Sequence, residues 1–116
     1  MIKPTKYYEM FVDTYYLNKE PKIYFTQVAV VRDTEHLLLI SGAHSCRQRL
    51  YKKDLCKVVE KTGYCKYIIY PEGQVEQALE KMRESFEREY SYAKKRETLV
   101  KLALKEVNRI GKEKHN

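Results

Sequence analysis

The sequence predicts an α+β fold: an antiparallel sheet of about five strands, able to curl into a small barrel, followed by a long C-terminal helix. Up to the segment YPEGQ at residues 70–74, β-branched and aromatic residues dominate, and after it Glu, Lys, Ala, Leu and Arg dominate. The predicted strands are joined by short connections, which favour an antiparallel meander. We therefore expect a single domain with a β-sheet region over 1–71 and a helical region over 72–116.

Alternation and turn residues define the predicted strands. In the first strand Tyr8, Met10 and Val12 share the face that we expect to be buried, and the other face is more mixed. Pro21 cannot donate to a ladder and is expected beside a strand, and Gly42 is expected to end the third strand. The predicted strands span residues 6–17, 23–31, 36–41, 46–51 and 64–70.

The segment between the last two strands is predicted to contain a short helix. Asp54 can cap a helix near 54–62, and Gly63 can end it. The continuous apolar centre of residues 64–70 then indicates a strand that is buried on both faces.

The C-terminal helix is predicted to be longer than the sheet. It starts near residues 72–75, and Gly111 is a plausible stop. Residues 74–110 would span about 55 Å as one helix, whereas a strand of about ten residues spans only about 33 Å. The helix must therefore break, protrude or pair with another chain, and Ser91, in a stretch of low helix propensity, marks the expected break.

Composition limits the classes of protein to which the chain can belong. Three cysteines cannot all pair internally and are expected to be reduced. No apolar run approaches the roughly 20 residues of a membrane span, so we expect no membrane contact and a cytoplasmic location. Abundant Lys, Glu, Tyr and Ile without Trp are compatible with an AT-rich bacterial or phage genome.

Positive charge is concentrated in two regions. The net charge of the chain is +7, and residues 45–66 and 94–116 each carry a net charge of +5, whereas residues 72–93 carry −3. Lys and Arg can neutralise phosphates, and Tyr can stack on unpaired bases. Solvation of a lysine-rich protein would explain the same charges, and the sequence contains no RRM, zinc-finger or helix-turn-helix signature. The candidate nucleic-acid-binding residues are Arg47, Arg49, Tyr51, Lys52, Lys53, Lys57, Lys94, Lys95 and Arg96.

The residue types around the cysteines suit two kinds of reactive site. His44, Cys46, Cys56 and Cys65 are zinc-ligand types, but their spacing contains no C-x₂-C pair. Cys46 has a histidine two residues away, but no third group that would orient a catalytic dyad is evident. We therefore expect structural thiols, no metal, no cofactor and no catalytic residues.

The apolar stripe of the later helix is the candidate protein interface. The acidic and basic halves of the helix suit antiparallel pairing, so we expect a homodimer through this helix. The candidate interface residues are Leu99, Leu102, Ala103, Val107 and Ile110.

These observations predict a small basic, non-enzymatic accessory or regulatory binding protein. Its expected partner is nucleic acid or a protein–nucleic-acid complex. The alternative is a protein-binding adaptor or inhibitor, encoded by a phage or mobile element, that acts through its long helix without direct nucleic-acid binding.

Overall fold

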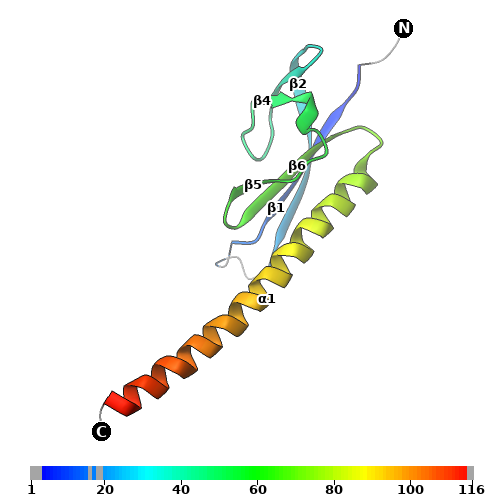
Figure 1. Cartoon of the computed structure of the whole chain (residues 1–116). Helices are drawn as coiled ribbons and strands as arrows, with labels where there is room; N and C mark the ends of the chain where they lie inside the picture. The colour runs from blue at the N-terminus through cyan, green and yellow to red at the C-terminus, as the bar shows by residue number, and fades with distance from the viewer. Residues whose placement is uncertain (1–3, 16, 18–19, 115–116) are drawn as a thin grey trace. The chain divides into compact units, whose positions relative to one another are not determined.

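The computed structural model describes residues 4–15, 17 and 20–114, so Tyr16 of the predicted first strand lies outside the described residues. It confirms the predicted fold class: an antiparallel six-stranded sheet curls into a half-barrel and is followed by one long helix (Figure 1). The elements are β1 Tyr7–Asp13, β2 Lys22–Asp33, β3 Leu37–Ser41, β4 Arg49–Tyr51, the 3₁₀ turn η1 Lys52–Asp54, β5 Val59–Thr62, β6 Cys65–Pro71 and α1 Val75–Lys114.

The sheet has the order β4-β3-β2-β1-β6-β5. The first four strands form a meander, and the β5–β6 hairpin adds to it through antiparallel pairing of β6 with β1. At the centre of β1, Met10 lies opposite Phe25 on β2 and opposite Ile68 on β6. This central position explains why β1 and β6 are the most buried strands.

Both faces of β1 are buried, so the prediction of a single well-buried face is wrong. Tyr7 and Phe11 belong to the main hydrophobic cluster on one face, and Met10, on the other, is only 2 % exposed. The predicted burial of the last strand on both faces is confirmed, because Cys65 to Tyr70 are all buried. The main cluster comprises Tyr7, Phe11, Val28, Leu38, Ile40, Ala43, Leu50, Cys65, Tyr67 and Ile69.

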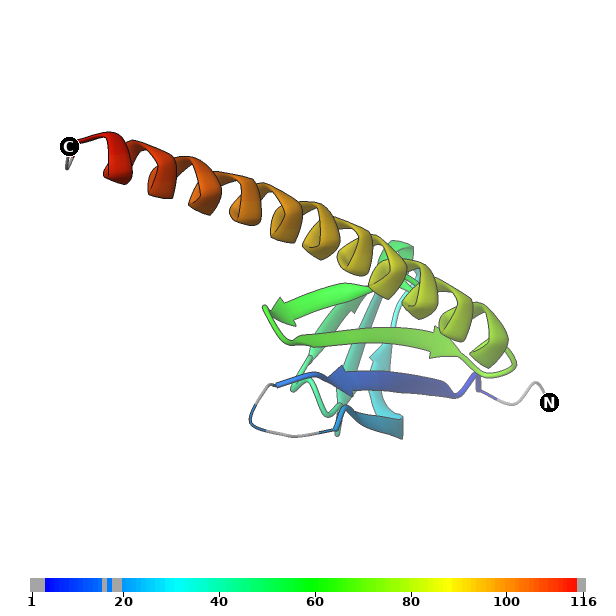
Figure 2. The same ribbon diagram turned by 90° about the horizontal axis from the view of Figure 1, so that it is seen from below.

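The first turns of α1 belong to the same compact unit as the sheet. Tertiary contacts divide the chain into Met1–Arg83 and Glu84–Asn116. Figure 2 shows these first turns of α1 beside the sheet. Ala78 and Met82 in these turns are buried, as is Ile68 on β6, which lies outside the main cluster. We interpret these side chains as a second apolar layer, because strand residues alternate between faces.

The region after β4 differs from its prediction. The expected helix near 54–62 is wrong: after η1 the chain passes Cys56 at φ 61° and then forms β5. A positive φ interrupts a right-handed helix, and Val59 is β-branched and suits a strand. Gly63 lies in the β5–β6 hairpin turn instead of ending a helix.

The predicted strand over 46–51 is shortened to β4, Arg49–Tyr51. Cys46 has a φ of 64°, and the chain turns at residues 44–45, so the strand conformation begins only after this turn. Arg47 therefore lies outside the strand, and the predicted strand start at Cys46 is wrong.

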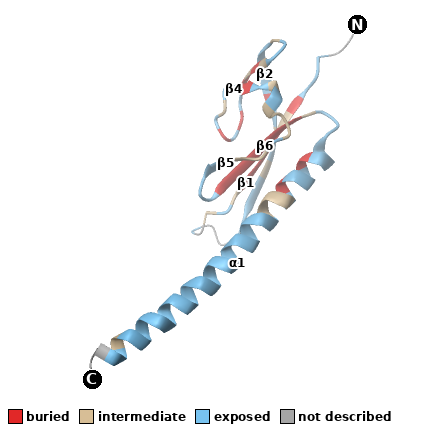
Figure 3. Cartoon of the chain, viewed as in Figure 1, coloured by how far each residue is buried: buried red, intermediate tan, exposed pale blue. Residues whose placement is uncertain are grey.

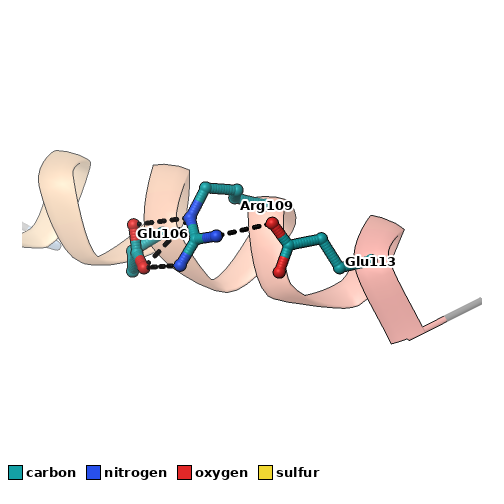
Figure 4. A network of polar contacts seen from close by, with 3 residues as sticks. All are labelled: Glu106, Arg109 and Glu113. Carbon is teal, nitrogen blue, oxygen red and sulfur yellow. Dashed lines mark hydrogen bonds and ion pairs between the residues drawn. The ribbon is translucent and has the colours of Figure 1, made fainter.

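The helix α1 runs without interruption through Ser91 and Gly111. Of the three alternatives for this helix, a break near Ser91 does not occur, and the stop predicted at Gly111 is wrong. Arg109 ties the turns on either side of Gly111 together, because it pairs with Glu106 and with Glu113, the latter at 2.6 Å (Figure 4). Within the described part of the chain, no helical stretch is long and apolar enough to cross a membrane.

Candidate binding surfaces

Arg47 is held by hydrogen bonds within the sheet unit. Its Nε donates to the carbonyl oxygen of Arg49 at 2.6 Å, and its Nη1 donates to the hydroxyl of Tyr67 at 3.2 Å. The side chain is half-buried and links the loop after β3 to β4 and β6. Two of its donors are therefore occupied by the fold, which makes Arg47 a poor candidate for phosphate binding.

Two lysines of the same predicted surface are paired with carboxylates. Lys52 Nζ lies 2.5 Å from Asp33 Oδ1, and hydrogen bonding to that carboxylate raises the pKa of Lys52. Lys57 Nζ lies 3.8 Å from Asp54 Oδ1. Pairing leaves less positive charge to attract a polyanion than the sequence count implies.

Arg49, Tyr51 and Lys53 form the exposed basic cluster of the sheet unit. The Arg49 guanidinium carbon and the Lys53 ammonium nitrogen are each 5.8 Å from the centre of the Tyr51 ring. Cations at this distance from a ring are attracted to its face. The cluster can offer two positive groups beside an aromatic ring, on the edge strand of the sheet.

The loop at residues 42–48 is held in place by hydrogen bonds to a buried carboxylate. Glu9 on β1 is fully buried and accepts hydrogen bonds from the Ser45 hydroxyl and from the Ser45 amide, the latter at 3.2 Å. His44 stacks on Tyr24, with ring centres 4.1 Å apart. These contacts position the turn that carries Cys46 and Arg47.

The thiols do not converge on a reactive centre. The Sγ of Cys46 lies 4.0 Å from the carbonyl oxygen of His44, whose ring packs on Tyr24 instead of facing the thiol. Within residues 4–15, 17 and 20–114, no group of three or more His, Cys, Asp and Glu side chains could hold a metal ion. Cys46 borders an open hollow of about 530 Å³ between β3 and the 42–48 loop, but no base accompanies it there.

Lys94, Lys95 and Arg96 do not form one patch. All three lie in α1 and are exposed. Consecutive helical residues point about 100° apart, so these side chains fan around the axis. Only Lys94 points toward the side on which the other basic residues of this helix gather.

Four lysines of α1 do share one side of the helix, and we call them the basic stripe. They are Lys94, Lys101, Lys105 and Lys112. Successive members are seven, four and seven residues apart, which is close to whole numbers of helical turns. Lys101 pairs with Glu97 at 2.9 Å, but Lys94, Lys105 and Lys112 form no ion pair with any residue that the structure describes. This regular spacing was readable from the sequence, once the helix was known to be unbroken.

The predicted interface residues are all exposed in the single chain (Figure 3). Leu99, Leu102 and Val107 expose 59 %, 58 % and 63 % of their surface. The prediction omitted Val100 and Leu104, which are 50 % and 60 % exposed. We define the apolar face of α1 by the residues that recur every three or four positions and by the two leucines beside them. Its members are Val100, Ala103, Val107 and Ile110, flanked by Leu99 and Leu104.

Leu102 lies away from this face. It precedes Ala103 by one position and therefore points about 100° away from it. The apolar face and the basic stripe lie on different sides of the same helix, which makes the later turns of α1 a basic amphipathic helix.

Comparison of the chain with protein-family models, with curated proteins and with solved structures found no match. Its function is therefore argued from these surfaces. They comprise the Arg49–Tyr51–Lys53 cluster on the sheet unit, and the basic stripe and apolar face on the helix.

Proposed function

We propose that this chain is a non-enzymatic accessory or regulatory binding protein that contacts nucleic acid, alone or in a protein complex, through the basic stripe of α1. The observation that carries the proposal is the alignment of four lysines along one side of a regular helix, three of them without an ion-pair partner among the described residues. Such lysines can exchange their counterions for phosphates, which supplies sequence-independent affinity.

The stripe places several cations along one side of a single helix. At about 1.5 Å per residue, its lysines are separated by about 10 Å and 6 Å along the helix axis. Each lysine can neutralise one phosphate, so the stripe offers up to four backbone contacts. The lysine ammonium group acts as a point charge toward phosphate, so the proposed contact is with the backbone and carries little sequence preference.

The Arg49–Tyr51–Lys53 cluster supports the same function on the sheet unit. Tyr51 is 46 % exposed and lies between two cations. An exposed aromatic ring with flanking positive charge can stack on an unpaired base while the cations contact phosphates. The cluster therefore supports a further contribution to the binding of single strands.

The test compares two variants of equal charge. In the stripe variant Lys94, Lys105 and Lys112 are changed to Gln. In the control, three exposed lysines of the sheet unit, Lys6, Lys22 and Lys61, are changed to Gln. Fluorescence anisotropy with labelled double-stranded DNA, double-stranded RNA and single strands is measured over a range of salt concentrations.

The stripe variant should lose affinity. The magnitude of the slope of log K against log salt should decrease by about 0.9 for each lost contact with B-form DNA, which is roughly 3 for the three substituted lysines. The control should lose much less, because its lysines lie outside the stripe. Equal losses in the two variants would mean that only the net charge matters, and unchanged binding by the stripe variant would reject the proposal.

The alternative function is a protein-binding adaptor or inhibitor that acts through α1. The observation in its favour is the exposed apolar face, on which Val100, Val107 and Ile110 are 50 %, 63 % and 41 % exposed. Capture of partners from a lysate with and without nuclease separates the two functions. Recovery that depends on nucleic acid favours the first. A stoichiometric protein that survives nuclease and is lost when Val107 is changed to Glu favours the second.

A further inference from the structure

The apolar face of α1 requires a partner surface. Its large members expose between 41 % and 63 % of their surface, and they follow one another along about three turns of helix. A contiguous apolar strip of this kind is typical of a protein-interaction site, whereas single exposed apolar residues are not. The spacing of Val100, Ala103, Val107 and Ile110 by three, four and three residues is that of a helix that packs against another helix.

The charge distribution of the helix indicates which partner fits. Residues 84–89 carry a net charge of −2, and residues 107–112 carry +2. In a parallel pair each of these segments would lie beside its own like-charged copy. In an antiparallel pair the acidic segment of one copy lies beside the basic segment of the other, which is the favourable arrangement.

We propose that residues 84–112 of α1 pair in antiparallel orientation with the same segment of a second copy of this chain, with the two-fold axis near Thr98. This register places Arg96 opposite Val100 and Glu89 opposite Val107 of the second copy, so neither charge lies directly opposite its own copy, as it would in a parallel pair. Ile110 lies opposite Phe86 of the second copy, Leu104 lies near Tyr90 of the second copy, and Leu99 lies near its own symmetry mate. Ala103 lies opposite Ala93 of the second copy, and two small side chains let the helices approach closely.

The pairing leaves the basic stripe on the outside of the helix pair. Lys94, Lys101, Lys105 and Lys112 point away from the apolar face, so a dimer presents two stripes. Because the apolar face and the basic stripe are separate surfaces, the dimer can form whether or not nucleic acid binds. The proposed occupant of the apolar face is a second copy of this chain, not a different protein.

The first experiment measures the oligomeric state of the full chain by light scattering at rising protein concentration. Wild type should form a dimer. Val107→Glu should raise the dissociation constant at least about tenfold, because it places a charge in the centre of the apolar face. Leu102→Glu is the matched control: it also introduces a charge at a leucine-rich position of the same turns, but away from the face, and should leave the dimer intact.

Circular dichroism of both variants should show the helix content of wild type. A wild-type chain that remains a monomer at high concentration would overturn the inference, as would equal weakening by the two substitutions. Val107→Glu should retain affinity for single DNA strands within a few-fold, so failure of the dimer and failure of nucleic-acid binding are distinguishable.

The second experiment measures orientation by disulfide trapping. The exposed and half-exposed thiols are first removed by Cys46→Asn and Cys56→Asn, since asparagine tolerates the positive φ at both positions. One new cysteine is then introduced by Leu99→Cys or by Val107→Cys. In the proposed register the two copies of residue 99 lie about 3 Å apart along the axis, and the two copies of residue 107 lie about 27 Å apart.

On mild oxidation Leu99→Cys should form a covalent dimer, and Val107→Cys should not. A parallel pair would bring the two copies of residue 107 together, so efficient trapping of Val107→Cys would contradict the inference. The absence of trapping in both variants would contradict it as well.

Discussion

At the scale of single residues, Arg47 acts as a brace between the 42–48 loop, β4 and β6. Its guanidinium donates to a backbone carbonyl and to the Tyr67 hydroxyl, and Tyr67 is itself only 4 % exposed. Hydrogen bonds from a charged donor contribute more than neutral ones, because the donor is ionised. Neighbouring Arg49 is exposed and has no comparable role in the fold.

We predict that Arg47→Gln lowers the free energy of unfolding by about 1–3 kcal/mol, whereas Arg49→Gln changes it by less than about 0.5 kcal/mol. Urea denaturation of the two variants and of wild type measures the difference. Arg49→Gln should instead reduce nucleic-acid affinity. Equal stability of both variants with wild type would contradict the bracing role of Arg47.

The buried pair of Glu9 and Ser45 supports the same loop from the sheet side. Ser45→Ala removes the hydroxyl that donates to the Glu9 carboxylate and leaves that buried oxygen with one donor fewer. We expect a loss of about 1–3 kcal/mol in the free energy of unfolding. A matched control is Ser41→Ala, because Ser41 is exposed. If thermal unfolding of the two variants is the same, the Glu9–Ser45 contact does not stabilise the loop.

The thiol of Cys56 should be slow to react. Burial raises its pKa, with Lys81 acting in the opposite direction, and its Sγ lies 3.1 Å from Gln74 Oε1. The thiolate is the reactive form, so a raised pKa shifts alkylation of the folded chain to higher pH than alkylation of the same residue in urea. Mass spectrometry of peptides alkylated over a pH series measures this shift. Identical pH profiles for Cys56 in the folded and unfolded chain would contradict it.

At the scale of elements, the strands were predictable wherever alternation and turn residues agreed. β2, β3 and β6 were identified because Ile23 to Val31, Leu37 to Ile40 and Tyr67 to Tyr70 are rich in residues that favour strands. β5 was missed because its sequence, Val59–Thr62, contains a Glu and a Lys and also fits a helix. Only its pairing with β6 decides between them, and such pairing cannot be read from local sequence.

The continuity of α1 was not predictable from residue propensities alone. Tyr90 to Tyr92 and Gly111 lower local helix propensity, but the surrounding Glu, Lys, Arg and Leu residues and pairs such as Glu97–Lys101 favour the helix. The basic stripe depends on continuity through Gly111, because a helix that ended there would not include Lys112. The sequence therefore indicated which basic and apolar residues could bind a partner. Only the structure showed which of them share one side of the helix.

Gly111 offers a direct test of this element. Among the glycines of the described chain, Gly42 and Gly73 have a positive φ and Gly111 does not. A Cβ added at Gly111 would meet no atom within 4 Å. We predict that Gly111→Ala stabilises the last turns of α1 by about 0.5–1 kcal/mol, because alanine is the better helix former. Amide hydrogen exchange should slow at residues 107–113. Faster exchange there would indicate that Gly111 ends the helix.

At the scale of the whole molecule, the chain comprises two compact units. The unit Met1–Arg83 contains the hydrophobic core, and the segment Glu84–Asn116 contains the basic stripe and the apolar face. The net charge of +7 attracts polyanions, but charge alone does not select a surface. The central claim is that the later turns of α1 are the surface that binds.

The most direct test of this claim is amide hydrogen exchange of the full chain, measured by mass spectrometry with and without saturating random-sequence DNA and RNA. We predict that exchange slows at residues 94–112, and to a smaller extent at residues 49–53 with single strands. Exchange in the central strands β1 and β6 should not change. Slowing that is confined to the sheet, or no change anywhere at saturation, would contradict the assignment of α1 as the nucleic-acid-binding surface.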